Sequence, residues 1–237
     1  MLYKIAHVVR DRIPWLWDLV NGLNAMLFQM IYGRRLRRVE ADVCGARHVL
    51  SGYDVVPIRD METERLVQFF SRQPEEAFWF FKPHPFDAKT IRKLQRNKAF
   101  LAYVLIDRAS GRMAGYCFNR SFFHGKGFRG RMVDIYYRGR GLGTMMNRLL
   151  NEVGFGIGLR LFETVSKDNV ASLRSAASAS HFMVVKALPH NELFLEITND
   201  MKLDNKLDTN LLGGGKEEES SLLPLHAACH ERERRTA

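Results

Sequence analysis

The chain has 237 residues, enough for one large domain or two small ones. Hydrophobic residues make up 46% and charged residues 26%, close to globular averages, so the composition argues against a wholly disordered, fibrous or multi-span membrane protein. Thirty-six Lys and Arg residues face 26 Asp and Glu residues. The resulting formal charge of +10 favours partners such as phosphate groups, nucleic acid or an anionic membrane surface.

The three cysteines, Cys44, Cys117 and Cys229, lie far apart and have no histidine at ligand spacing. This pattern disfavours both a disulfide framework and a structural zinc site. No small-residue cleavage pattern follows the first apolar stretch, so we expect no secretory signal and a reducing, cytoplasmic setting.

Residues 13–32 are largely apolar, but polar and glycine residues interrupt them and argue against a bilayer span. At helical spacing they present one apolar face, and four arginines follow at positions 34, 35, 37 and 38. The apolar face consists of Trp15, Leu16, Leu19, Leu23, Met26, Leu27, Met30 and Ile31.

The pattern over residues 13–38 is typical of an amphipathic helix lying on an anionic membrane surface. The alternative is that the apolar face packs on the body of the protein or on a second subunit. Residues 1–40 are interpreted as a separate N-terminal helical segment.

Residues 33–53 show little periodicity and are interpreted as a connector or a weak early strand. Residues 54–58 alternate enough for a short strand. Helices are predicted over 60–71, with Asp60 as the N-terminal cap, and over 87–97, a basic segment opened by Asp87. The aromatic, proline-rich stretch between them is expected to pack as core or loop, or to form a wall facing a substrate.

Three strands are predicted over 99–106, 112–119 and 130–137, and their short connections imply an antiparallel meander. The elements that follow are a helix over 144–153, a strand over 159–165, a helix over 169–180, and strands over 182–187 and 193–198. This order predicts a mixed α/β or α+β domain around one sheet, spanning residues 41–200. Residues 201–237 are expected to form a mostly disordered tail.

The most informative string runs from Val133 to Thr144, where a strand leads into alternate glycines that open a helix. Glycines leave backbone N–H groups accessible at the positive end of a helix dipole, which favours phosphate binding. The P-loop alternative fails because no Lys-Ser or Lys-Thr follows the glycines. The GxGxxG dinucleotide fingerprint is also missed, because the next glycine after Gly143 is Gly154. The alternative interpretation, a glycine turn that binds no ligand, is left open at this point.

The string Arg138-Gly139-Arg140-Gly141-Leu142-Gly143 is similar to the Arg/Gln-x-x-Gly-x-Gly/Ala signature of the GNAT superfamily of acyl-CoA-dependent N-acyltransferases. Residues 165–174, in which an asparagine opens a helix after a strand, resemble the second motif of that family. The resemblance covers residues 53–198. It implies an α/β (α+β) fold with a mixed, mostly antiparallel central sheet that is splayed between strands 4 and 5 and flanked by helices.

The resemblance further implies that the chain binds acetyl-CoA as acyl donor and needs no metal. The pantetheine arm is expected along Ile135 and Tyr136 of the fourth strand, with Asn169 and Ser172 on the other side of the splay. The pyrophosphate is expected over the loop formed by Arg138, Gly139, Arg140, Gly141, Leu142, Gly143 and Thr144.

Transfer to an amine needs a group that takes a proton from the attacking nitrogen. Asp134, in the strand that would carry the thioester, and Glu163, in the strand across the splay, are the candidate bases. An ion pair with an arginine is the alternative for each.

The family often has a tyrosine seven residues after the asparagine, where it protonates the leaving thiolate. Ala176 stands at that position here. The role is left to Ser172, Ser175, a water or direct proton transfer from the acceptor, or else transfer is slow or absent. Tyr136 and Tyr137 are further candidate donors.

The leading hypothesis is an acetyl-CoA-dependent N-acetyltransferase in which an amine acceptor attacks the thioester directly. An amino sugar of surface-polysaccharide synthesis would suit an enzyme that is peripheral on the inner face of a membrane. The alternative is a non-catalytic, membrane-associated protein that retains the acetyltransferase fold. Nucleic acid ranks last among the partners, because no recognition motif or stacking platform accompanies the arginines.

Overall fold

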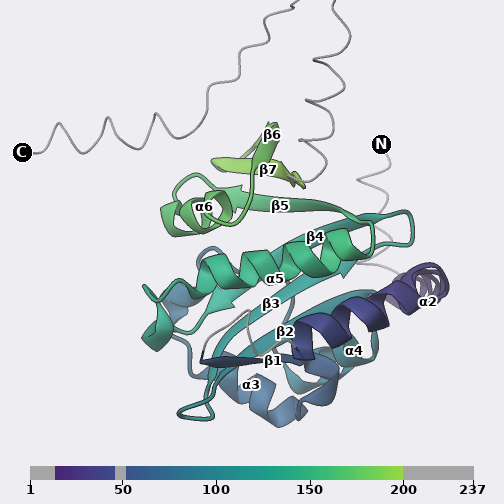
Figure 1. Cartoon of the computed structure of the whole chain (residues 1–237), viewed down its shortest axis with the longest axis horizontal. Helices are drawn as coiled ribbons and strands as arrows, with labels where there is room; N and C mark the ends of the chain where they lie inside the picture. Colours follow the sequence, from purple (N-terminus) through teal and green to yellow (C-terminus); the bar gives the residue numbers. More distant parts are fainter. Residues whose placement is uncertain (1–13, 46–51, 200–237) are drawn as a thin grey trace, which may run out of the picture. The chain divides into compact units, whose positions relative to one another are not determined.

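A computed structural model of the chain describes residues 14–45 and 52–199. Within them, helices flank one seven-stranded sheet with the order β1-β2-β3-β4-β5-β7-β6 (Figure 1). The tail predicted over 201–237 lies outside the described residues. The strands are β1 (Tyr53–Pro57), β2 (Phe100–Asp107), β3 (Met113–Ser121), β4 (Lys126–Val133), β5 (Arg160–Ser166), β6 (Phe182–Leu188) and β7 (Glu192–Ile197).

The sheet is antiparallel everywhere except between β4 and β5. These two parallel strands pair at only three positions, from Lys126↔Arg160 to Phe128↔Phe162. Beyond Phe128, β4 runs on to Val133 with no β5 residue in register, while β5 continues to pair with β7. The sheet therefore opens between its fourth and fifth strands, which confirms the predicted fold class.

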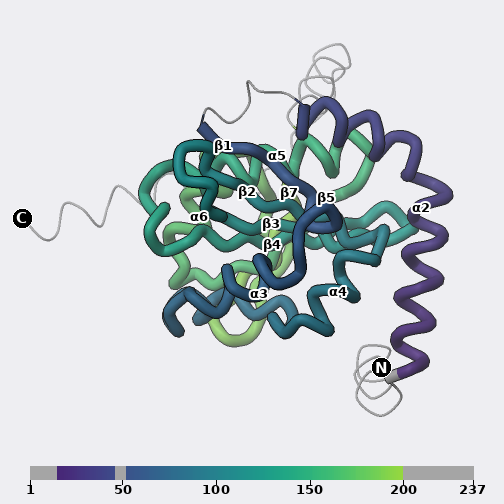
Figure 2. The backbone as a smooth tube through the Cα atoms, turned by 90° about the horizontal axis from the view of Figure 1, so that it is seen from below, coloured from purple at the N-terminus to yellow at the C-terminus, as the bar shows by residue number. Residues whose placement is uncertain are grey.

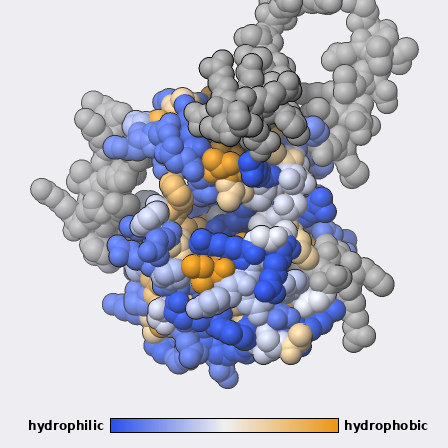
Figure 3. Space-filling view, turned by 90° about the vertical axis from the view of Figure 1, so that its left-hand side faces the viewer, coloured by the Kyte–Doolittle hydropathy of each residue, from blue (hydrophilic) through white to orange (hydrophobic). Residues whose placement is uncertain are grey.

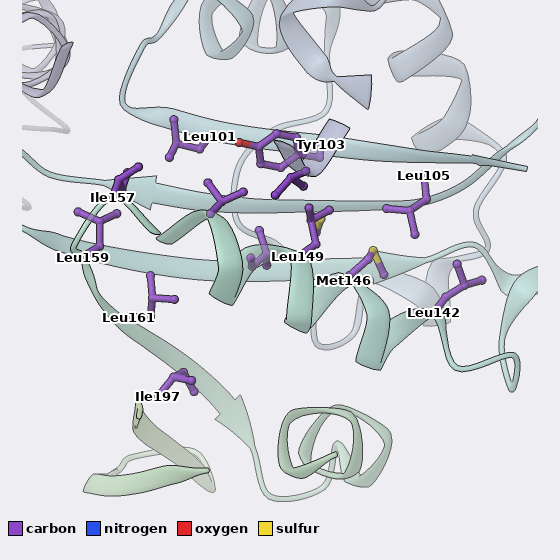
Figure 4. Close-up of a cluster of buried hydrophobic side chains, with 14 of the residues drawn as sticks. Leu101, Tyr103, Leu105, Leu142, Met146, Leu149, Ile157, Leu159, Leu161 and Ile197 are labelled. Carbon is purple, nitrogen blue, oxygen red and sulfur yellow. The ribbon is translucent and has the colours of Figure 1, made fainter. Parts of the chain in front are cut away.

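The two faces of the sheet carry separate buried clusters of side chains. Helix α5 (Leu142–Gly156) lies on one face, where its apolar residues and alternate residues of β2 belong to one cluster (Figure 4). Helices α3 (Thr63–Ser71) and α4 (Ala88–Arg96) cover the other face, over a cluster rich in phenylalanine. A last helix, α6 (Val170–Ala177), follows β5.

Helix α2 spans Pro14–Gly45 and runs along one side of the body (Figure 2). The prediction that residues 33–53 form a connector or strand is wrong for 33–45, because Leu36 and Val43 are buried and the helix continues through them. The helix also crosses residue 40, where the N-terminal segment was expected to end. Neither α2 nor any other described helix has the apolar run that a bilayer crossing requires.

The two aspartates predicted to start helices have opposite outcomes. Asp87 caps α4, because its Oδ1 accepts a hydrogen bond from Thr90 N at 2.9 Å. The prediction for Asp60 is wrong, since that residue lies in a short 3-10 turn, η1 (Ile58–Asp60), and α3 begins only at Thr63. Gln95 donates to the carbonyls of Ile58 and Met61, both at 2.7 Å. A side chain of α4 thus stabilises this turn.

The end of β4 also differs from the predicted strand over 130–137. The strand begins at Lys126 and ends at Val133, and Ile135–Tyr137 form a 3-10 turn, η3. The cause is local, because the carboxylate of Asp134 accepts a hydrogen bond from Tyr136 N at 3.0 Å and turns the chain. Ile135 and Tyr136 are therefore not part of the fourth strand.

Candidate functional site

The loop between η3 and α5 presents a group of backbone donors. Gly139 and Gly141 have φ values of +75° and +77°, a left-handed conformation that favours glycine. Within the described chain, the N–H groups of residues 139–144 have no acceptor, and the first one bonded is that of Met145, to Gly141 O. Six free donors at the positive end of a 15-residue helix suit a phosphate group.

The side chains of this loop divide into two kinds. Leu142 is buried in the core beside α5, so only its backbone is available to a ligand. Arg138, Arg140 and Arg148 are exposed and add positive charge around the free N–H groups. The side of the molecule that carries α6 is largely hydrophilic, with isolated apolar patches (Figure 3).

The unpaired stretch of β4 offers further backbone groups. Asp134 N donates to Ala114 O on β3, whereas Gly125 O accepts from Arg160 N, next to β5. Because backbone direction alternates along a strand, the N–H groups of Arg131 and Val133 point away from β3, toward the side where β5 no longer pairs. An amide-containing chain lying in the splay can satisfy these groups.

The backbone of the two residues expected to contact pantetheine is already engaged. Ile135 N donates to Gln73 Oε1 at 3.2 Å, and Tyr136 N donates to Asp134 Oδ1. The side chains of both residues are exposed. Arg131 and Val133 thus occupy the strand position that was predicted for Ile135 and Tyr136.

Asn169 and Ser172 lie at the start of α6, across the splay from β4. Asn169 is the N-terminal cap of this helix and accepts from Ser172 N at 3.1 Å. Ser172 Oγ accepts a 2.8 Å hydrogen bond from Arg131 Nη2 on β4. A Cβ atom placed on Gly143 would lie 3.2 Å from Ser175 Cβ, so that glycine allows α5 and α6 to approach closely.

Asp134 is fully buried and engaged by three groups. Its carboxylate accepts from Arg72 Nη2 at 2.7 Å, from Gln73 Nε2 at 2.8 Å and from Tyr136 N. Burial alone would raise its pKa, but the hydrogen bonds from Gln73, Tyr136 and Arg72 outweigh burial and hold the pKa below its ordinary value. The ion-pair alternative raised by the sequence is what this geometry shows.

Glu163 lies in a second buried ion pair, with two arginines of β4. Arg129 Nε donates to it at 2.8 Å and Arg131 Nη1 at 2.7 Å. Burial would raise the pKa of Glu163, but the charges of Arg131 and Arg129 and the hydrogen bonds from them together outweigh burial and lower that pKa. Both candidate bases are therefore charged groups with full sets of partners.

Comparison with known proteins agrees with this architecture. No family model matches the sequence, and a search of curated proteins finds no relative. Among solved structures, the GNAT domain of PAT from S. lividans superposes with a TM-score of 0.54 at 16% identity, over 61% of this chain and 89% of that one. The ribosomal-protein-S5-alanine acetyltransferase from Vibrio fischeri gives 0.53 at 14% identity, over 64% of this chain and 96% of that one.

A spermidine N-acetyltransferase chimera of Vibrio cholerae SpeG and hSSAT gives 0.51 at 15% identity, over 65% of this chain and 99% of the other. The chain has the GNAT fold. At these identities the likeness concerns the fold, and what the chain does has to be argued from its own residues.

One departure from the GNAT pattern is visible in α6. Ala176, at the position where the family often has tyrosine, is buried. Near it, Arg131 Nη2 reaches across from β4 to Ser172 O at 2.9 Å and to Ser175 Oγ at 3.0 Å. Arg129 and Arg131 were not predicted from the sequence. The available signal was two arginines two residues apart in a strand, which places both on the face that also carries Glu163.

An open pocket of about 570 Å³ lies beside the aromatic loop before α4, lined by Phe78, Lys82, Pro83, His84, Pro85 and Phe86. Burial lowers the pKa of His84. Its Nδ1 lies 2.8 Å from Pro85 O, which can only accept, so Nδ1 carries the proton and Nε2 accepts from Tyr116 at 3.1 Å. His84 therefore holds the loop in place with both of its nitrogens.

The hairpin before β4 carries His124, at the opposite end of that strand from the loop of residues 139–144. Among residues 14–45 and 52–199, no three His, Cys, Asp or Glu side chains gather closely enough to hold a metal ion.

Proposed function

We propose that the protein is an N-acetyltransferase that uses acetyl-CoA as donor and a small-molecule amine as acceptor. The observation that carries the proposal is the line of free backbone donors from the splay of β4 to the start of α5. The N–H groups of residues 139–144 would hold the pyrophosphate. Those of Val133 and Arg131 would hold the pantetheine amides, and beside them Asn169 and Ser172 would line the same cofactor.

Acetyl-CoA supplies the acetyl group as a thioester. A strand N–H that points into the splay would polarise the thioester carbonyl. The acceptor must arrive as a neutral amine, and water would take its proton, because Asp134 and Glu163 are committed to arginines. These carboxylates would position Arg72, Arg129 and Arg131 and would not act as bases.

The acceptor is proposed to enter beside the aromatic loop. Phe81 of this loop lies over β4, 3.4 Å from a Cβ atom placed on Gly130, so the loop borders the strand that would carry the thioester. Polyamines and amino sugars are the acceptor classes to assay first, since one structural neighbour is named a spermidine N-acetyltransferase.

Calorimetry with acetyl-CoA tests the cofactor site. Gly141→Val should weaken binding at least about tenfold, because its Cβ enters the open space over the loop. Gly111→Val is the matched control. It too changes a glycine with positive φ and open space around it, but in the β2–β3 turn, and it should leave affinity unchanged. Absence of binding by the unaltered protein at millimolar acetyl-CoA would overturn the proposal.

A second candidate function is a membrane-associated protein that retains the fold without catalysis. It is favoured by the buried Ala176, which stands where the family often has tyrosine. Release of the coenzyme A thiol with a panel of amines separates the two functions. An acetyl-CoA complex that releases thiol with none of them favours the non-catalytic protein.

We further propose that α2 places the protein on an anionic membrane. Before Phe28, polar contacts join this helix to the body, since Asn24 Nδ2 donates to Ser121 O and Asn24 Oδ1 accepts from Phe123 N. The side turned to solvent is apolar, with Trp15, Leu19, Leu23, Met26, Met30 and Ile31 all more than half exposed. The alternative of packing on the body does not fit these residues.

The charge of α2 indicates which kind of partner covers this apolar side. Arg34, Arg35, Arg37 and Arg38 follow it on the same helix and add positive charge beyond its apolar end. Tryptophan at one end and arginines at the other suit a helix lying at the interface of an anionic bilayer, where each basic residue contributes about 1 kcal/mol. A second copy of the chain packed in parallel on this helix would bring the same arginines together.

Flotation of the full chain with phosphatidylserine-containing vesicles tests this placement. Truncation near residue 40 would uncover the core that Phe28 and Leu36 fill, so point variants are the better probe. Leu19→Ser with Leu23→Ser should abolish flotation, whereas Met183→Ser with Val185→Ser, at exposed apolar positions of β6, should not. Equal flotation of both pairs, or a dimer lost only in the α2 pair, contradicts membrane binding.

A further inference from the structure

The splay between β4 and β5 contains a buried cationic cluster near its closed end. Arg129 and Arg131 share the single carboxylate of Glu163, and the three side chains are 0%, 6% and 5% exposed. Arg129 Nη2 has no hydrogen-bond acceptor in the described chain, although it is buried. With two cations, one anion and an unused donor, this buried cluster is short of one negative charge.

The hydroxyl groups around the cluster are already used as donors. Ser175 Oγ donates to Ser172 O at 2.9 Å, and Ser172 Oγ approaches Glu163 Oε1 at 3.4 Å. Neither serine has a proton free for a leaving group in this arrangement. The charged group nearest these serines, on the helix that also carries the buried Ala176, is the guanidinium of Arg131, held by Glu163, Ser172 and Ser175.

The path of the cofactor brings its thiol to this cluster. If the pyrophosphate lies over residues 139–144, the pantetheine arm runs from there along Val133 toward Arg131. The strands come together at Phe128↔Phe162, so the arm ends between the loop and that pair, at the level of Arg131 and Glu163. This step rests on the proposed function.

We propose that Arg131 is a catalytic residue that stabilises the coenzyme A thiolate as an anion, in place of an acid that protonates it. The amine nitrogen bonds to the carbonyl carbon, the C–S bond breaks, and its electron pair stays on sulfur. The amine proton passes to water. The guanidinium keeps all its protons, because arginine does not act as an acid in this pH range, and acts through its charge.

The decisive experiment titrates the thiol of coenzyme A bound to the full-length protein, by ultraviolet absorbance of the thiolate. The same protein with desulfo-coenzyme A supplies the background of tyrosines and cysteines. A cation within hydrogen-bond reach should lower the pKa of the bound thiol by at least about one unit from that of free coenzyme A titrated in the same buffer. Arg131→Met should remove that shift, and Arg131→Lys should keep part of it.

Two controls separate chemistry from folding. Arg131→Met with Glu163→Gln removes both charges of the pair and should also lose the shift. Arg160→Met removes an exposed arginine that pairs with Glu196 at the start of β5, and should keep the shift. In acetyl transfer, Arg131→Met should lower kcat about 100-fold with little change in the KM for acetyl-CoA.

The outcomes distinguish the two levels of the proposal. Coenzyme A that binds with an unshifted thiol pKa, or with a shift that survives Arg131→Met, overturns the role of Arg131 alone. Failure of the unaltered protein to bind coenzyme A overturns the proposed function and this inference with it.

Discussion

Asp134 is surrounded by donors, and the groups that contact its carboxylate come from two distant parts of the chain. Arg72 and Gln73 follow α3, whereas the Tyr136 amide lies two residues after Asp134 itself. The same carboxylate therefore ends β4, starts η3 and fixes the end of α3 against both. Its sequence context shows only the acid and the nearby arginines, so the two readings of base and ion pair could not be separated without the partners 61 and 62 residues away.

Asp134→Asn is expected to lower the free energy of unfolding by about 2–4 kcal/mol, because the partly buried Arg72 loses its fully buried counter-charge. Urea denaturation measures the change. Asp54→Asn is the matched control, since Asp54 pairs with Arg108 at the surface, and it should cost no more than about 1 kcal/mol. Similar losses in the two variants would show that burial adds nothing to the Asp134 pair.

Acid should destabilise the protein through the same two carboxylates. Asp134 and Glu163 have folded-state pKa values below their ordinary values, so their contribution is complete above the unfolded values, about 4. It is lost as the pH falls through the lower, folded values. Urea midpoints between pH 6 and pH 3 should fall less steeply in Asp134→Asn and Glu163→Gln than in the unaltered protein. Parallel curves would contradict the ion-pair assignment.

At the scale of elements, the sequence predicts the strands of the sheet and the glycine turn before α5 well, because both depend on neighbours in the chain. It fails where an element's end depends on distant residues. The end of β4 is set by Asp134 and its partners, and α2 extends beyond Gly33 because Leu36 and Val43 find a core. The cluster around Arg131 was missed for the same reason, since its members come from β4, β5 and α6.

Replacing two glycines in or beside helices by alanine should change the stability of the protein in opposite directions. Gly141→Ala is expected to cost about 1–2 kcal/mol, because its φ of +77° is unfavourable for any side chain. Gly22→Ala, within α2 and with open space around it, should stabilise by about 0.5–1 kcal/mol. Thermal denaturation of the two variants checks the signs, and a loss in both would show that Gly22 has a contact of its own.

On the scale of the whole molecule, one buried cluster lies on each face of the sheet, and α2 contributes to the cluster beneath α5. The positive charge is similarly localised. Between Arg108 and Arg148 the sequence has nine Lys or Arg residues and a single acidic residue, Asp134, and a second basic group ends the apolar side of α2. The protein is thus basic where a phosphate-bearing ligand and a membrane are proposed to bind.

Two neighbouring positions of α2 test how the helix joins the body. Phe28 is fully buried and Met30 is 74% exposed. Phe28→Ala should lower the free energy of unfolding by about 3–5 kcal/mol through the cavity it leaves. Met30→Ala should change it by less than about 0.5 kcal/mol. Chemical denaturation measures both, and equal effects would mean that this turn of the helix is oriented differently.

Helix α2 is attached to the body in two different ways along its length. From Phe28 onward it is anchored by apolar burial, but before that its polar contacts within the described chain are those of Asn24 and an ion pair between Asp18 and Lys93. Water can replace such contacts at a small net cost. The first turns are therefore expected to detach while the rest of the fold stays intact, which would let the apolar side of α2 align with a surface independently of the sheet and its other helices.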